Sequence, residues 1–98
     1  MPEQIDKQTF SPLLNQKFQI HVGEVPINAE LVDVSSRGKA NEQQGLREPF
    51  SLLFRTEPES LFGQGNYLVT HPELDDMAIF LVPNRPDDAG MYYEAIFS

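Results

Sequence analysis

The sequence predicts an all-β fold: a single small domain of six antiparallel strands, closed into a barrel or folded into a sandwich, with a short N-terminal helical turn. Two observations predict this class. Apolar residues recur mostly at the short period of strands, and turn-forming residues interrupt the apolar segments often. At 98 residues, of which 40% are hydrophobic, the chain suffices for one modest core, so we expect one domain over residues 1–98.

The N-terminal segment is expected to hold the helical turn. We expect residues 1–8 to be flexible. Within 9–16, Thr9 or Ser11 is expected to cap a short turn, and Pro12 suits a first helical position. Three apolar side chains of this turn are expected to plug one end of the core: Phe10, Leu13 and Leu14.

The next two segments are predicted to be strands joined by a turn at 23–26. Residues 18–22 carry apolar side chains at every second position, which is typical of a half-buried strand. Along 27–34 the apolar positions change parity at Val32, so this strand either bulges or is covered on both faces. The polar segment 35–45 contains two glycines and is expected to be a flexible surface loop.

Four further strands are predicted in the second half of the chain: 50–54, 66–71, 77–82 and 91–97. The segment 77–82 is an almost unbroken apolar run, which predicts a central strand buried on both faces. A turn at 71–76 precedes it. The last two strands are expected to form a hairpin through 84–90, with Gly90 at positive φ.

Charge and composition exclude some partners and narrow the cellular setting. The net charge is −8, and residues 57–98 carry eight acidic side chains against the single basic Arg85. Such a surface repels phosphate backbones, so we expect no nucleic-acid partner. No apolar run approaches the roughly 18 residues that a membrane span needs, and the N-terminus lacks signal-peptide features. With no cysteine, we expect a cytoplasmic protein, or one assembled into a larger particle, with no membrane partner.

Residues that carry chemistry are sparse, so we expect no enzyme activity, no metal and no cofactor. A Ser or Thr nucleophile needs a neighbouring base, but the chain has no Gly-x-Ser-x-Gly elbow, and its only histidines are His21 and His71. His71 is close in sequence to the carboxylates of 73–76. Alternate residues of a turn, however, seldom converge on one metal ion.

Two arginines flank the apolar strand of 50–54, and they have two interpretations. In the first, Arg47 and Arg55 pair with carboxylates of a neighbouring strand, such as Glu94 or Glu73. In the second, they join exposed tyrosines in a patch that anchors another protein, because Arg and Tyr dominate interface energetics. That patch consists of Arg47, Arg55, Tyr92 and Tyr93.

We therefore expect a non-enzymatic interaction or structural module that presents a strand edge or this patch to a larger protein. β-Strand addition is the expected mode. The competing interpretation is a small-ligand-binding barrel, whose mouth would gather Phe62, Tyr67 and His71. Both interpretations leave homo-oligomerisation open.

Three stretches of the chain, REPFSLLFR, QGNYLVTHPEL and AIFLVPNRPDDAGMYYEAIF, resemble a family of bacterial domains of unknown function of about this length. The resemblance runs from Phe10 to Phe97. The family is often encoded beside phage-tail-collar-like proteins of the microcystin-dependent type. The resemblance implies no catalytic residues, and it implies a tail-collar-like or fibre-like protein as the partner, by analogy of gene location.

Overall fold

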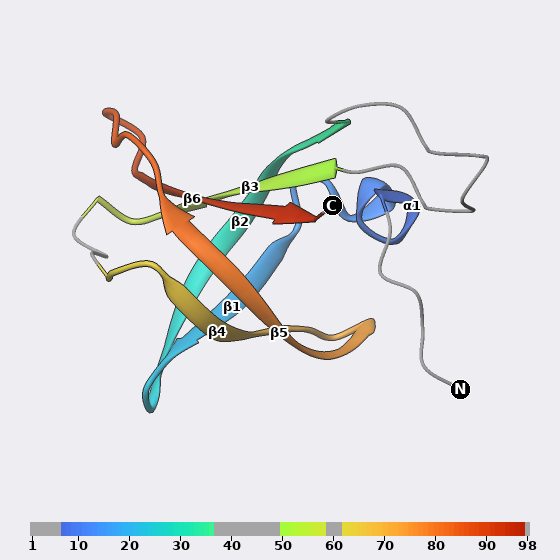
Figure 1. Ribbon diagram of the computed structural model, residues 1–98, viewed down its shortest axis with the longest axis horizontal. Helices are drawn as coiled ribbons and strands as arrows, with labels where there is room; N and C mark the ends of the chain where they lie inside the picture. The colour runs from blue at the N-terminus through green and yellow to red at the C-terminus, as the bar shows by residue number, and fades with distance from the viewer. Residues whose placement is uncertain (1–6, 37–49, 59–61, 98) are drawn as a thin grey trace.

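Six antiparallel strands close into a barrel in the computed structural model, which describes residues 7–36, 50–58 and 62–97 (Figure 1). In chain order the strands are β1 (Lys17–Val22), β2 (Val25–Ser36), β3 (Phe50–Thr56), β4 (Gly65–His71), β5 (Leu74–Pro83) and β6 (Met91–Phe97). The structure confirms the predicted all-β class and selects the barrel over the sandwich. Each predicted strand is present, with its ends moved by up to three residues.

Two three-stranded meanders, β1 to β3 and β4 to β6, make up the barrel. They join along two lines, because β3 pairs with β6 and β4 pairs with β1. The β3–β6 line holds seven residue pairs, from Phe50↔Phe97 to Thr56↔Met91, and the β1–β4 line holds three. This topology brings β3, near the middle of the chain, beside β6, its last strand.

Two hairpin turns are shorter than the sequence predicts. Val22 pairs with Val25, so the first turn is only two residues long, with Gly23 at a φ of 62° that favours glycine. His71 pairs with Leu74, so the predicted turn at 71–76 is also reduced to two residues. In both places the strand pairing extends into residues with weak strand propensity, because tertiary pairing overrides local preference.

A β-bulge interrupts β2 at Val32, as one of the two predicted alternatives requires. The register with β3 shifts between Leu31 and Asp33, which leaves Val32 as the extra residue. Before the bulge, odd positions such as Ala29 face the core, and after it the even-numbered Val34 packs against the core. The change of parity in the sequence therefore marked a real feature of the backbone.

Buried apolar side chains fill the barrel interior, as is typical of small barrels. Among the described residues the core consists of Phe10, Leu13, Phe18, Ile20, Ala29, Leu31, Phe50, Leu52, Phe54, Val69, Ile79, Leu81, Met91, Tyr93 and Ala95. Both meanders contribute to this core. The interior is thus a packed core of side chains from both halves of the chain.

A short helical segment plugs one end of the barrel. It consists of α1 (Lys7–Phe10) and the 3-10 turn η1 (Ser11–Leu13), and the Phe10 ring centroid lies 6.1 Å from that of Phe97. The expected plug loses one member, because Leu14 is 41% exposed where the chain leaves the turn. The N-cap of η1 is Phe10, with no side-chain cap bond, in place of the predicted Thr9 or Ser11. No helix among the described residues is long and apolar enough to cross a membrane.

The two segments predicted to be flexible lie mostly outside the described residues. Residues 7–8 belong to α1 and residues 35–36 belong to β2, so both predictions are too long at these ends. Residues 1–6 and 37–45 lie outside the described part of the chain.

The prediction that 77–82 is buried on both faces is wrong. Ile79 and Leu81 are buried, but Ala78 and Phe80 between them are exposed, with Phe80 retaining 49% of its accessible surface. A barrel has a single interior, so every strand turns alternate side chains outward. The unbroken apolar run therefore places hydrophobic side chains on the outer surface.

Candidate interaction surface

Arg55 lies in the middle of a polar row that crosses three strands of the outer surface. The register places Glu30 of β2 directly opposite Arg55 on one side and Tyr92 of β6 opposite it on the other. An Arg55 Nη2 group donates a hydrogen bond to Glu30 Oε1 at 2.9 Å. The predicted partners Glu94 and Glu73 are therefore wrong for Arg55, because β3 pairs Leu53 rather than Arg55 with Glu94.

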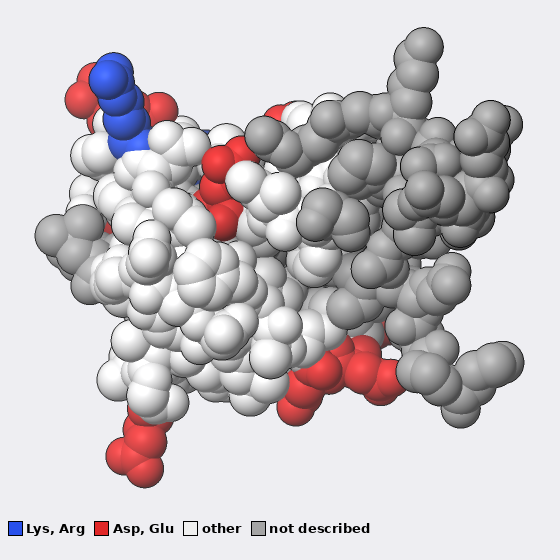
Figure 2. All heavy atoms as spheres, in the orientation of Figure 1, with Lys and Arg blue, Asp and Glu red and all other residues white. Residues whose placement is uncertain are grey.

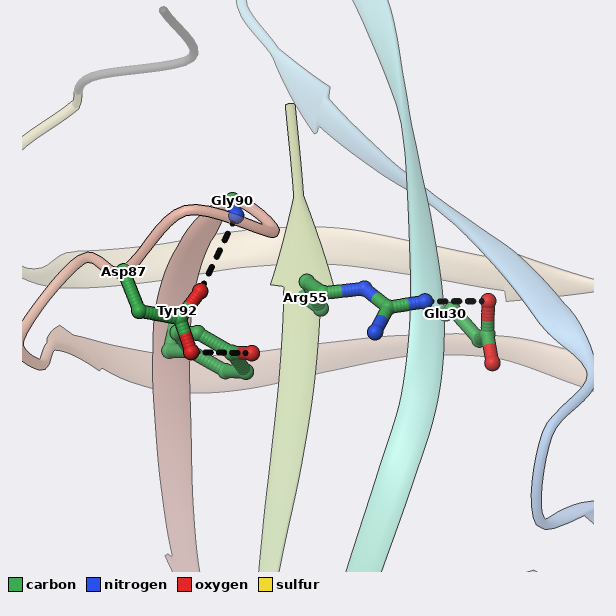
Figure 3. Close-up of polar contacts among 5 residues, drawn as sticks. All are labelled: Glu30, Arg55, Asp87, Gly90 and Tyr92. Atoms are coloured by element: carbon green, nitrogen blue, oxygen red, sulfur yellow. Dashed lines mark hydrogen bonds and ion pairs between the residues drawn. The ribbon is translucent and has the colours of Figure 1, made fainter. Parts of the chain in front are cut away.

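Tyr92 continues this row into the turn between β5 and β6. Its hydroxyl donates to Asp87 Oδ2 at 2.9 Å, and Asp87 Oδ1 accepts hydrogen bonds from the backbone amides of Ala89 and Gly90 at 2.8 and 3.2 Å (Figure 3). The Ala89 amide and the Tyr92 hydroxyl hold the pKa of the Asp87 carboxyl below its ordinary value. The bond to Asp87 in turn raises the pKa of Tyr92. Asp87 thus organises the turn that leads into β6.

The structure brings together two members of the predicted Arg/Tyr patch. Arg55 and Tyr92 are both half-buried neighbours on adjacent strands. Tyr93 is fully buried, since alternation turns it to the interior, and Arg47 lies outside the described residues. The polar groups of Arg55 and Tyr92 already bond within the domain, so a partner would have to compete with these internal contacts.

Two residues of the predicted ligand pocket pack against each other without leaving a mouth between them. The Phe62 ring stacks on Tyr93 with centroids 3.8 Å apart, and the edge of Tyr67 meets Phe62 at 4.7 Å. The Phe62 amide donates to the Tyr93 hydroxyl at 2.9 Å, and burial raises the pKa of that hydroxyl. Phe62 and Tyr67 therefore cover the buried Tyr93.

His71, the third member of that predicted pocket, lies elsewhere. Tyr67 and His71 are near opposite ends of β4, which separates them by about 13 Å along an extended chain. The imidazole packs on Phe18 at a centroid distance of 4.7 Å. Its Nδ1 accepts the Glu73 amide hydrogen at 3.0 Å, so Nε2 carries the proton that faces Gln16 Oε1 at 2.8 Å. Both ring nitrogens of His71 are therefore engaged within the domain.

A groove with both polar and apolar walls lies at the surface near His71. It encloses about 460 Å³ and is lined by Lys17, Phe18, Gln19, Asn28, Thr70, His71 and Pro72. A second groove of about 210 Å³ continues from it toward Arg55 and shares Lys17 and Asn28 with it. Sequence reasoning missed both grooves, because their walls come from strands that are far apart in the chain. The only local signal of these grooves was that every second residue of β1 is polar, which places polar side chains on the outer surface.

The barrel is weakly closed between β5 and β6. The register pairs these strands only at Val82↔Glu94 and Pro83↔Tyr93. Figure 1 shows the two strands diverging from the turn that joins them. We call the part of the β5–β6 boundary without this pairing, between Asp76–Leu81 of β5 and Ala95–Phe97 of β6, the seam.

Exposed apolar side chains lie on both sides of the seam. Phe80 is 49% exposed and Ile96 is 53% exposed, while on β4 the residue opposite Ala78, Leu68, is 42% exposed. In the described part of the face that Figure 2 shows, most of the surface is white, which marks residues other than Lys, Arg, Asp and Glu, with acidic residues around it and basic atoms near the β5–β6 turn. Sequence reasoning missed this patch because it assigned the same run to a doubly buried strand.

Comparisons with known proteins identify a family and nothing further. A model of the family described as Domain of unknown function (DUF6916) matches residues 5–97 of the chain. No curated protein and no solved structure matches.

Proposed function

The chain belongs to the DUF6916 family of unknown function, and we propose that it is a non-enzymatic protein-interaction module that binds a partner through the outer surface beside the seam. The interior does not compete for this role, because apolar side chains of the core occupy it. The binding surface is then on the outside of the barrel.

One observation carries this proposal: large apolar residues point outward next to an incompletely paired strand. Phe80 and Ile96 each retain about half of their accessible surface, and the register between their strands ends at Val82↔Glu94. Exposed apolar side chains that gather in one place mark interaction sites more often than scattered ones do. An unpaired strand edge adds backbone groups that a partner can use.

The finer part of the proposal concerns the identity of the partner. We propose a tail-collar-like or fibre-like protein, encoded nearby, as the partner. This rests on the gene neighbourhood that the family resemblance implies.

Affinity capture tests the proposal directly. The tagged domain is expressed in the cell that encodes it, and the proteins that copurify are identified by mass spectrometry and then mixed with the domain in purified form. We expect one partner at a fixed stoichiometry in size-exclusion chromatography with light scattering. An unrelated domain of equal net charge is the control for charge-driven capture. Recovery of no specific partner by a folded, abundant bait contradicts the proposal.

A second candidate function is supported by the groove of about 460 Å³ beside His71. An ammonium, two amides and a hydroxyl line it, from Lys17, Gln19, Asn28 and Thr70, and such groups recognise a small polar ligand. A thermal-shift screen over polar metabolites tests this function. We expect a stabilising compound to lose its effect in Gln19→Ala; a screen with no stabilising compound argues against the ligand-binding function.

A further inference from the structure

The direction of the backbone groups along β6 can be read from one hydrogen bond. The Asn84 amide donates to the Tyr92 carbonyl at 2.8 Å, so the backbone groups of Tyr92 point toward β5. Successive residues of a strand direct their N–H and C=O groups to opposite sides. The groups of Glu94 and Ile96 therefore also point toward β5. Glu94 has Val82 as its partner there, but the register gives Ile96 no partner on β5.

The facing edge of β5 has the same property over a longer stretch. Val82 pairs with Glu94 across the seam, so by alternation Phe80, Ala78 and Asp76 direct their backbone groups toward β6. The register supplies none of these three with a partner on β6. On its other side β5 is paired with β4 from Met77 to Leu81. Among the described residues, β5 is therefore supported by β4 on one side, while its edge from Asp76 to Phe80 has no strand partner on the other.

The charged side chains of the strands that carry the seam are acidic. The strands β4, β5 and β6 contain no lysine or arginine. Asp75 and Asp76 lie at one end of the seam, and Glu94 lies at the other. An acidic frame around apolar side chains favours a partner with basic residues flanking apolar ones.

We propose, on the basis of the interaction function proposed above, that the unpaired edge of β5 takes up an extended segment of another protein as an added strand. The backbone of this segment pairs with Asp76, Ala78 and Phe80. Its apolar side chains lie against Phe80 and Ile96, and a lysine or arginine at its end beside Asp76 pairs with that carboxylate. The backbone bonds provide affinity, and the alternate side chains provide specificity.

A second copy of this chain is the less suitable occupant. Edge-to-edge pairing of two copies would bring the acidic residues of both seams together, and each chain carries a net charge of −8. Like charges placed opposite each other on paired strands are destabilising. The charge pattern therefore selects a basic partner over self-association.

The test uses a synthetic peptide as the probe. The peptide has a central run of valines flanked by lysines, over about eight residues, the length of an ordinary strand, and a matched peptide carries glutamate in place of lysine. Binding to the full-length, isotope-labelled protein is followed by nuclear magnetic resonance. We expect the lysine peptide to shift the amides of Ala78, Phe80 and Ile96, with an affinity that falls as salt is added. We expect the glutamate peptide not to bind.

Two substitutions locate the site. Phe80→Ser removes an exposed apolar contact and should weaken binding of the lysine peptide about tenfold. Val25→Ser is the matched control, because Val25 is also exposed, at 60%, but lies in the β1–β2 hairpin. We expect it to leave the affinity unchanged. Both variants should keep the melting temperature of the wild type within a few degrees, which separates a binding effect from unfolding.

The outcomes separate this inference from the proposed function. Failure of the lysine peptide to bind, equal binding of both peptides, or shifts located away from the seam overturns the strand-addition inference. Self-association that Phe80→Ser abolishes assigns the seam to a second copy instead and overturns the basic partner. If the partner captured from the cell binds the Phe80→Ser variant as tightly as the wild type, the proposed function stands and the seam is not its site.

Discussion

The two edges of β6 differ in how they are used. Toward β3 the strand pairs at seven consecutive positions, from Phe97↔Phe50 to Met91↔Thr56. Toward β5 the register holds only two pairs. The first edge lies over a packed core, and the second opens beside exposed apolar side chains. The comparison teaches that one strand can close the barrel along its whole length on one side while it pairs at only two positions on the other.

The largest expected effect comes from comparing one substitution on the two strands that flank β6. Phe54 on β3 is fully buried, so Phe54→Ala should lower the free energy of unfolding by about 3–5 kcal/mol. Phe80 on β5 is half exposed, so Phe80→Ala should cost about 1 kcal/mol or less. Denaturant unfolding of the two variants measures the difference. Equal losses would show that the seam is as tightly packed as the β3 side.

A smaller effect is expected at the turn that sets the start of β6. A Cβ atom added at Gly90 would lie 2.1 Å from the backbone carbonyl oxygen of Thr56, which cannot move without disturbing β3. Gly90→Ala should therefore destabilise by about 3 kcal/mol. Gly23→Ala is the control. A Cβ atom at Gly23 would have open space around it, so the cost comes only from holding alanine at a φ of 62°, which is about 1 kcal/mol. Equal unfolding midpoints for the two variants would contradict this account.

Hydrogen exchange sharpens the comparison without any substitution. The Ala95 amide points toward β3 and should exchange only with large-scale opening, whereas the Ile96 amide points toward the seam and should exchange at least about a hundredfold faster. The Glu94 amide is the internal control, because it points the same way as Ile96 but has Val82 as its partner. Slow exchange of Ile96 would mean that this edge is already paired.

The smallest expected effect is the pH dependence of the β5–β6 turn. The pKa of Asp87 is lowered in the folded protein by the Ala89 amide and the Tyr92 hydroxyl. A lowered pKa contributes stability above the ordinary carboxyl value, and this contribution is lost as the pH falls through the folded pKa. Asp87→Asn should therefore have a lower melting temperature than the wild type at neutral pH, and the gap should narrow in acid. Asp88→Asn, a matched charge change in the same turn, should not show this narrowing.

The sequence predicted the strands well, because alternating apolar residues and turn-forming residues can both be recognised over a few positions. Alternation predicted β1, and the change of parity at Val32 predicted the bulge that the register confirms. The apolar run of β5 was misleading, since periodicity alone cannot tell a doubly buried strand from one with an apolar outer face. The partner of Arg55 was also out of reach, because Glu30 is opposite it only through the register of β2 with β3.

The candidate site was predicted less well than the fold. Arg55 and Tyr92 are neighbours on adjacent strands, but Tyr93 belongs to the core and His71 lies away from Phe62 and Tyr67. A side chain's neighbours across a sheet depend on strand order, which alternation does not encode. A strand has the same alternation of apolar and polar residues whichever strands it pairs with, so the alternation does not reveal its neighbours.

The sequence by itself determined the all-β class, the number of strands and the acidic charge of the second half, because composition, alternation and turn residues act over a few positions. Only the tertiary structure decided which strands pair, which side chains line a groove and where the pairing of two neighbouring strands ends. Closure of a barrel depends on all six strands at once: β3 pairs with β6 and β4 pairs with β1, and the β5–β6 pairing ends after two residues. No local pattern in the sequence records where that pairing ends, because it depends on residues that are far apart in the chain.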